Sequence, residues 1–110
     1  MIKVILGFKR RPGMSVEAFR RYRQDTHAPI LFAIPEARNI RRFVVSYPLD
    51  TGPEAAPFDA VVEAWFDSPA DMDGLFLSEN FRTQVDPDHA RFIDLSSVVR
   101  MVSQEVVVVP

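Results

Sequence analysis

Apolar side chains alternate with other side chains in four parts of the chain, a pattern of period two that is typical of β-strands. The pattern begins at the N-terminus, where Ile2, Val4, Leu6 and Phe8 occupy every second position. The four segments predicted to be strands are 2–9, 40–47, 60–67 and 98–104. Four valines at 106–109 could form a further strand that adds to a sheet, in this chain or in a partner.

A helix is predicted after the first strand. Ser15 offers a hydroxyl that can cap the N-terminus of a helix over 16–27. Pro29 disfavours helical geometry at the residue before it and is therefore expected to end this helix. The apolar residues 30–35 are then predicted to form a single packed turn between two prolines.

Two later segments combine a capping residue with a proline at the first helical position. Ser68-Pro69 predicts a helix over 69–78, and Asp86-Pro87 predicts a short helix that ends near Asp94. The intervening segment 49–58 is rich in glycine and proline, so we expect it to be a mobile connection.

The resulting order is strand, helix, strand, strand, helix, strand. Two split β-α-β halves of this kind predict a ferredoxin-like α+β sandwich, whose helices cover one face of an antiparallel sheet. The residues predicted to share the other face are Val61, Glu63, Trp65, Val98 and Val102. Because this face is rich in large apolar groups, we expect a second copy of the chain to cover it in a homodimer.

Composition and charge narrow the classes of function. A chain of 110 residues, 47% of them hydrophobic and 25% charged, is typical of one globular domain. A net charge of −2 does not supply the field that nucleic-acid binders use, so no nucleic-acid partner is expected. The N-terminal apolar stretch is too short for a signal peptide or a membrane span, which favours a cytoplasmic location.

The chain has two histidines and no cysteine, which excludes thiol nucleophiles and makes a metal site a weak case. No phosphate-binding loop or dinucleotide fingerprint is present. His27 is a candidate general acid or base, because imidazole titrates near neutral pH and apolar residues follow it. The alternative is a structural histidine that bonds the free carbonyls of a helix end. If the helix persists, His27 lies about three turns after Val16 and shares its inward side.

Two carboxylates and several aromatic residues are further candidates. Asp88 could orient His27 or the substrate, or it could simply favour the N-terminus of a short helix. Glu63 is an isolated charge in an apolar strand, so it is either a carboxyl with a raised pKa or a salt-bridge partner of Lys3 or Arg100. The aromatic side chains that could line a cleft, or only pack, are Tyr22, Phe32, Tyr47 and Trp65.

A series of short motifs runs through almost the whole chain. It comprises the strand at Met1, His27-Ala28-Pro29, the aromatic strand after Arg38-Asn39, Val61-Glu63-Trp65 before Asp67-Ser68, and Asp88 followed by Phe92-Ile93-Asp94. In order and spacing this series resembles the EthD family of dimeric α/β barrels. One departure is His89, because members of the family usually have Glu after this Asp.

The resemblance implies a ferredoxin-like monomer whose sheet packs against a second copy. It also implies a cleft between sheet and helices that binds a small hydrophobic molecule without a redox cofactor. The family is named for a protein linked to ethyl tert-butyl ether degradation, and its relatives include a muconolactone methylisomerase and polyketide dehydratases or cyclases.

These expectations lead to a functional hypothesis. The chain is expected to be a cofactor-independent enzyme of catabolism or secondary metabolism that isomerises or dehydrates a hydrophobic carbonyl compound. His27 would transfer the proton, and His89 would contribute little. The alternatives are a cofactor-free monooxygenase and a non-catalytic protein that holds a hydrophobic intermediate of a degradation pathway.

Overall fold

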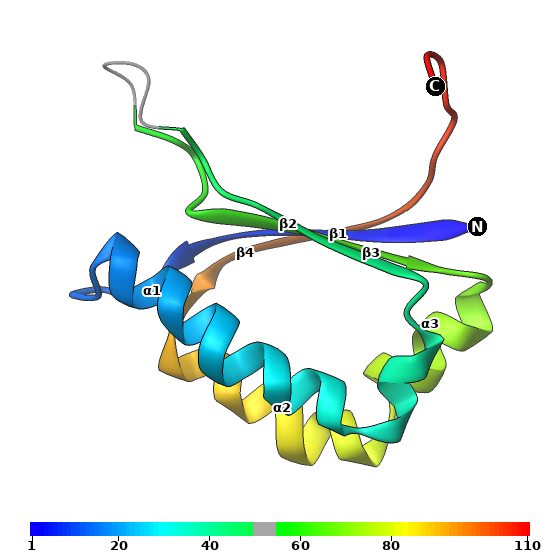
Figure 1. Cartoon of the computed structure of the whole chain (residues 1–110), viewed down its shortest axis with the longest axis horizontal. Helices are drawn as coiled ribbons and strands as arrows, with labels where there is room; N and C mark the ends of the chain where they lie inside the picture. The colour runs from blue at the N-terminus through cyan, green and yellow to red at the C-terminus, as the bar shows by residue number, and fades with distance from the viewer. Residues whose placement is uncertain (50–54) are drawn as a thin grey trace.

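The computed structural model describes residues 1–49 and 55–110 and has the predicted ferredoxin-like α+β fold. Its strands are β1 (Ile2–Arg10), β2 (Arg42–Ser46), β3 (Ala60–Phe66) and β4 (Ile93–Gln104). They form one antiparallel sheet in the order β2-β3-β1-β4. The helices are α1 (Val16–Tyr22), α2 (Ala28–Ala33) and α3 (Pro69–Phe76). All three lie on one side of the sheet, so its other face is left open (Figure 1).

The first helical segment continues past Pro29, contrary to the prediction from the sequence. Helix α1 leads into a π-helical turn, Arg23–His27, and this first π turn leads directly into α2. Within it the Ala28 N–H bonds the carbonyl of Arg23, five residues back. Pro29 then lies in the first turn of α2, a position where a missing N–H costs little.

The predicted packed turn at 30–35 is therefore wrong. Most of this segment belongs to α2, and a 3₁₀-helix over Pro35–Asn39 follows it. The apolar run between two prolines does not indicate that the helix continues, because the π turn that accommodates Pro29 has no evident sequence signature.

The second helical segment begins as predicted and then departs from expectation. Ser68 caps α3 by accepting a hydrogen bond from the Asp71 N–H. Beyond α3 lie a second π turn, Phe81–Val85, and a 3₁₀-helix, Asp86–Arg91. Strand β4 starts at Ile93, so it is longer than the predicted strand at 98–104 and includes the expected end of the short helix.

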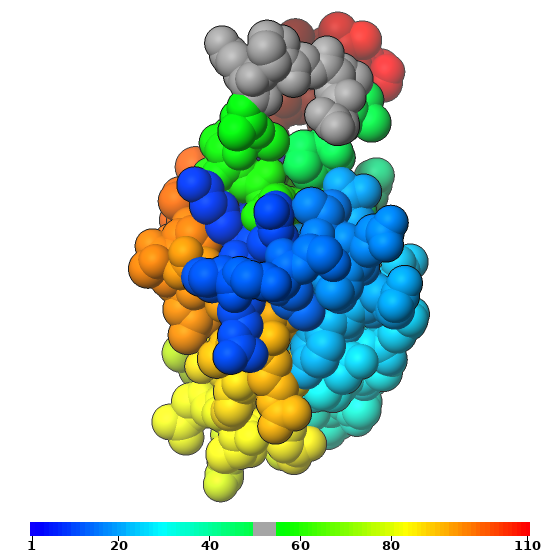
Figure 2. All heavy atoms as spheres, turned by 90° about the vertical axis from the view of Figure 1, so that its left-hand side faces the viewer, coloured from blue at the N-terminus to red at the C-terminus, as the bar shows by residue number. Residues whose placement is uncertain are grey.

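Aromatic rings fill the space between the sheet and the helices at the α1 end. Phe8 of β1, Phe19 of α1 and Phe92 before β4 are all buried, with ring centroids 5.9–6.5 Å apart. The two helical segments, blue to cyan and yellow to orange in Figure 2, lie side by side below the sheet. This cluster therefore holds three separate parts of the chain together.

The face assignment of β4 made from the sequence is wrong by one residue. Val102 pairs with Val4, whose side chain is buried under the helices, so Val98 and Val102 point to the helical side of the sheet. The open face instead carries Val99 and Met101. Because β4 has apolar residues on both faces, its sequence pattern does not fix which face is buried.

Beyond Gln104 the chain leaves the sheet on its open side (Figure 1). Val106, Val107, Val108 and Val109 are exposed and form no strand within this chain. Their pairing with a partner stays a prediction. The predicted mobile connection at 49–58 lies partly outside the described residues.

Replacing Phe19 with Ala should lower the free energy of unfolding by about 3–5 kcal/mol, because Phe19 is completely buried and its removal leaves a cavity. Phe32→Ala is the matched control, and it should cost much less because the Phe32 side chain is 50% exposed. Chemical denaturation of both variants measures the difference. Similar losses from the two would show that this aromatic cluster does not hold the layers together.

Candidate active site

The buried carboxylate of Asp88 joins the two helical segments. One of its oxygens accepts a hydrogen bond from the Tyr22 hydroxyl at 2.6 Å, and the other lies 2.9 Å from Nδ1 of His27. His27 is 4% exposed and Asp88 7%. Residues from α1, the first π turn and the last 3₁₀-helix therefore form one continuous chain of hydrogen bonds.

The first π turn places His27 on the inward face of its helical segment. The buried residues of this segment lie four apart, at Phe19, Arg23, His27 and Leu31. In a regular α-helix such a row would drift around the axis, whereas a π turn rotates less per residue and keeps the row on one face. Val16, expected to share this side, is exposed, because the wide turn changes the phase between the two positions.

Asp88 is ionised and determines the tautomer of His27. Burial pushes the pKa of Asp88 up, but the hydrogen bonds from Tyr22 and His27 outweigh burial and hold this pKa below its usual value. A carboxylate only accepts hydrogen bonds, so the proton of the pair is carried by Nδ1 of His27. Burial and the bond to Asp88 likewise raise the pKa of Tyr22, which keeps its hydroxyl a donor.

The imidazole of His27 is neutral at pH 7. Burial is the main cause that lowers its pKa to about 4, helped by the electrostatic effect of the neighbouring His89 and Arg23 and opposed by Asp88. Among the described residues Nε2 has no hydrogen-bond partner, yet it is not one of the fully buried polar atoms that lack one. Nε2 therefore carries a lone pair that faces open space. The alternative of a histidine bonded to helix-end carbonyls does not hold.

That open space is a cavity between the sheet and the helices. Its inner part encloses about 70 Å³ and is lined almost entirely by apolar side chains, with Arg23, His27 and His89 as the polar exceptions. An outer part of about 270 Å³ shares Leu6, Phe81 and His89 with it and extends toward β4. The two parts together form an apolar site with a few polar groups, as expected for a small-molecule ligand.

Two further polar residues line this cavity: His89, which was expected from the sequence to contribute little, and Arg23, which was not a candidate. The His89 ring lies with its centroid 4.6 Å from that of His27, and its Nδ1 is 3.1 Å from Asp86. Arg23 is 5% exposed, one helical turn before His27. Only the four-residue spacing of Phe19, Arg23 and His27 could have indicated the position of Arg23.

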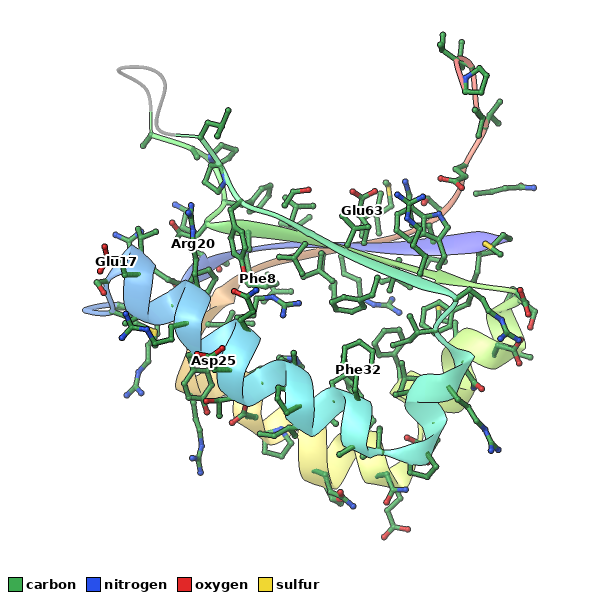
Figure 3. All side chains as sticks on the ribbon, viewed as in Figure 1. Phe8, Glu17, Arg20, Asp25, Phe32 and Glu63 are labelled. Atoms are coloured by element: carbon green, nitrogen blue, oxygen red, sulfur yellow. The ribbon has the colours of Figure 1, made fainter. Side chains whose placement is uncertain are left out.

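Other residues proposed from the sequence lie elsewhere. Glu63 projects from the open face of the sheet (Figure 3) and pairs with Lys3 at 2.9 Å, while Trp65 of that face donates to Glu105 at 3.0 Å. Tyr47 packs under Arg20 at the far end of β2. The structure does not bring these three proposed residues to the cavity.

Phe32 and Tyr22 are nearer to the cavity than the open-face residues. Phe32 stacks edge-to-face on Phe43, a cavity residue, with centroids 5.6 Å apart. Tyr22 reaches the site through its bond to Asp88. Both support the site and neither lines the cavity wall.

The comparisons with known proteins show the family to which the chain belongs. Residues 11–96 match the model of the EthD domain, so the chain belongs to the EthD family. Two relatives are similar in sequence. The dehydratase ustZ of Ustilaginoidea virens is 29% identical over 102 residues, which span 82% of this chain and 72% of the relative. The conidial pigment biosynthesis dehydratase EthD of Metarhizium robertsii is 29% identical over 99 residues, 79% of this chain and 70% of the relative.

Solved structures show the same fold. An EthD-family protein of Bacillus halodurans superposes with a TM-score of 0.75 at 20% identity, covering 96% of this chain and 99% of that one. A dimeric protein of ferredoxin-like fold from Bacteroides fragilis has a TM-score of 0.67 at 16% identity, covering 94% of this chain and 95% of that one.

Residues 1–49 and 55–110 contain neither a metal-binding cluster nor a membrane-spanning helix. No group of three or more histidine or acidic side chains there could hold a metal ion. No helix in the same part of the chain is long and apolar enough to cross a membrane.

The depressed pKa of His27 predicts an acid-sensitive fold. Its pKa is about 4 in the folded chain and 6.5 when unperturbed, so the unfolded state binds the extra proton first. The contribution of His27 to the free energy of unfolding is fully present above pH 6.5, and up to about 3 kcal/mol of it should be lost as the pH drops to 4. Denaturation curves at several pH values measure this loss. His27→Gln should remove most of the dependence and His89→Gln should retain it, and an unchanged slope in His27→Gln would contradict the assignment.

Proposed function

We propose that this protein is a cofactor-independent dehydratase that eliminates water from a small hydrophobic β-hydroxy carbonyl compound. The observation that supports it is the hydrogen-bond chain Tyr22–Asp88–His27, which ends in the free Nε2 lone pair at an apolar cavity. A neutral imidazole held in one tautomer by a carboxylate is suited to act as a general base.

The proposed reaction moves one proton from the carbon next to the carbonyl to the hydroxyl group that leaves the adjacent carbon. Nε2 of His27 removes a proton from the carbon next to the carbonyl, and the electron pair moves into an enolate. The enolate then re-forms the carbonyl and expels the β-hydroxyl group, which takes the proton from the His27 imidazolium and leaves as water. The product is an α,β-unsaturated carbonyl compound, and His27 returns to its neutral form.

Asp88 supports both halves of this cycle. While His27 is neutral, Asp88 holds the tautomer that exposes the Nε2 lone pair, and once His27 is protonated, the carboxylate stabilises the imidazolium. Tyr22 satisfies the other carboxylate oxygen and keeps Asp88 in place. We assign Tyr22 and Asp88 as positioning residues and His27 as the catalytic residue.

The family relationship supports the reaction class. Both sequence relatives are named dehydratases, and one of them is named for the biosynthesis of a pigment. The apolar walls of the cavity favour a substrate whose ring or chain is hydrophobic.

We further propose that the protein functions as a homodimer whose subunits meet through the open faces of their sheets. Val99 and Met101 are more than half exposed on this face, and the structural relative from Bacteroides fragilis is described as dimeric. A second copy would remove these side chains from water.

Activity can be measured with 3-hydroxy-1-tetralone, a bicyclic β-hydroxy ketone that becomes fluorescent 1-naphthol after loss of water. His27→Ala should reduce turnover by about 10²–10⁴-fold while leaving the fold intact. Asp88→Asn should also reduce it strongly, because an amide can donate to Nδ1 and place the proton on Nε2. The matched control is Asp25→Asn, an exposed carboxylate on the same helical segment, which should leave turnover unchanged.

Two results would contradict this proposal. Tight binding of tetralones without any turnover would favour a non-catalytic binding protein. Oxygen consumption with a panel of hydroquinones would favour a monooxygenase.

The dimer is tested by light scattering at micromolar concentration, where we expect twice the mass of one chain and an interface of more than about 1,200 Å². Met101→Glu should produce a monomer, because it places a charge in the covered face. Leu77→Glu, at an exposed apolar residue on the helical side, should remain dimeric. A monomeric native protein would contradict the proposal.

A further inference from the structure

Arg23 is a buried cation without a buried counter-charge. Its side chain is 5% exposed, and its Nε is completely buried without a hydrogen-bond partner. None of the ion pairs formed by residues 1–49 and 55–110 includes it. Its guanidinium lies over the ring of Phe43, with the ring centroid 5.5 Å away.

Such an arrangement is unfavourable for the protein alone. Removing a guanidinium from water costs free energy that only good hydrogen bonds and an opposite charge offset, and one cation–π contact returns a small part of it. Burial accordingly lowers the pKa of Arg23. A residue that is costly to the empty fold and lies in a cavity is expected to have a partner that arrives with the ligand.

The position of Arg23 defines where that partner must lie. Arg23 precedes His27 by one turn on the same inward face, and both line the inner part of the cavity. Apart from His89, the other walls of the inner part are apolar. An oxygen of the ligand that bonds Arg23 therefore lies close to whichever ligand atom meets Nε2 of His27.

We propose that Arg23 binds the carbonyl oxygen of the substrate and stabilises it as the negative charge of the enolate develops. This inference rests on the proposed function and extends it to the identity of the oxyanion-binding group. When Nε2 of His27 removes the proton from the neighbouring carbon, the electron pair moves to this oxygen, and the guanidinium donates hydrogen bonds to it. The charge returns to the carbon skeleton when the hydroxyl group leaves as water, so Arg23 keeps its own protons throughout.

The assignment also specifies the ligand. The substrate must present its carbonyl oxygen to the inner cavity and its hydrophobic body to the outer part, since Arg23 lines only the inner part. Compounds with a fixed negative oxygen at this position should bind more tightly than their neutral isosteres, because they supply the charge that Arg23 lacks.

Binding is tested first, without any reaction. Calorimetry at pH 7.5 with 2-naphthoate and its neutral isostere 2-naphthamide compares the native protein with Arg23→Met, which keeps the length and apolar stem of the side chain. We expect the native protein to prefer the carboxylate at least tenfold, and Arg23→Met to lose this preference while binding the amide equally well. Arg23→Lys, which retains the charge without the planar fork, should keep part of the preference.

Two further measurements separate ligand binding from a structural role. Thermal unfolding of Arg23→Met should give an unchanged or higher midpoint, because the variant removes an unpaired buried charge. With 3-hydroxy-1-tetralone as substrate, the fold decrease in kcat of the same variant should be at least ten times its fold increase in KM. The reason is that an enolate exists only along the reaction path.

The outcomes distinguish this inference from the proposed function. Turnover that is lost in His27→Ala but normal in Arg23→Met would overturn the role of Arg23 and leave the dehydratase proposal standing. A carboxylate preference that depends on Arg23 in a protein without turnover would overturn the dehydratase proposal and leave Arg23 as a binding residue. An Arg23→Met variant that unfolds at a lower temperature and retains the preference would show that Arg23 is structural.

Discussion

The ionised carboxylate of Asp88 is the constraint on which the site depends. A buried carboxylate is tolerated only when donors satisfy it, and here the donors come from a segment more than sixty residues earlier in the chain. Tyr22 and His27 must therefore approach the last 3₁₀-helix closely, which fixes the separation of the two helical segments. The cavity lies beside this junction and is lined by residues of both segments. One electrostatic requirement thus shapes the fold and the tautomer of His27 together.

The general fold could be predicted from the sequence because its signals are local. Alternation in 2–9 and 60–67, the Ser15 cap and the Ser68-Pro69 start each depend on a few neighbouring residues. The phase of β4 could not be predicted, since apolar residues occupy both of its faces and only the pairing of Val102 with Val4 decides which side is buried.

Part of the site could be predicted from the sequence, although the structure gives different reasons for the role of each residue. His27 was selected as a residue at the end of a helix, whereas it lies inside a longer helical segment that a π turn carries past Pro29. Asp88 was one of two candidate carboxylates, and only tertiary structure separates it from Glu63, which pairs with Lys3 on the opposite face. Arg23 was not selected as a site residue, because the stem of an arginine on the inward side of a helix ordinarily leaves its charged head in water; the burial of the head follows from packing across to β2.

The first π turn has a consequence for how the length of this segment can vary. A π turn holds one more residue than the α-helical turn it replaces, so it is equivalent to a single insertion into a regular helix. Deleting any one residue between Arg23 and His27 would restore ordinary helical winding without rotating α2 relative to α1, because the wide turn absorbs the extra residue. Leu31 would then keep its place in the core. The π turn therefore permits the length of this segment to change by one residue without changing which side chains beyond it face the core.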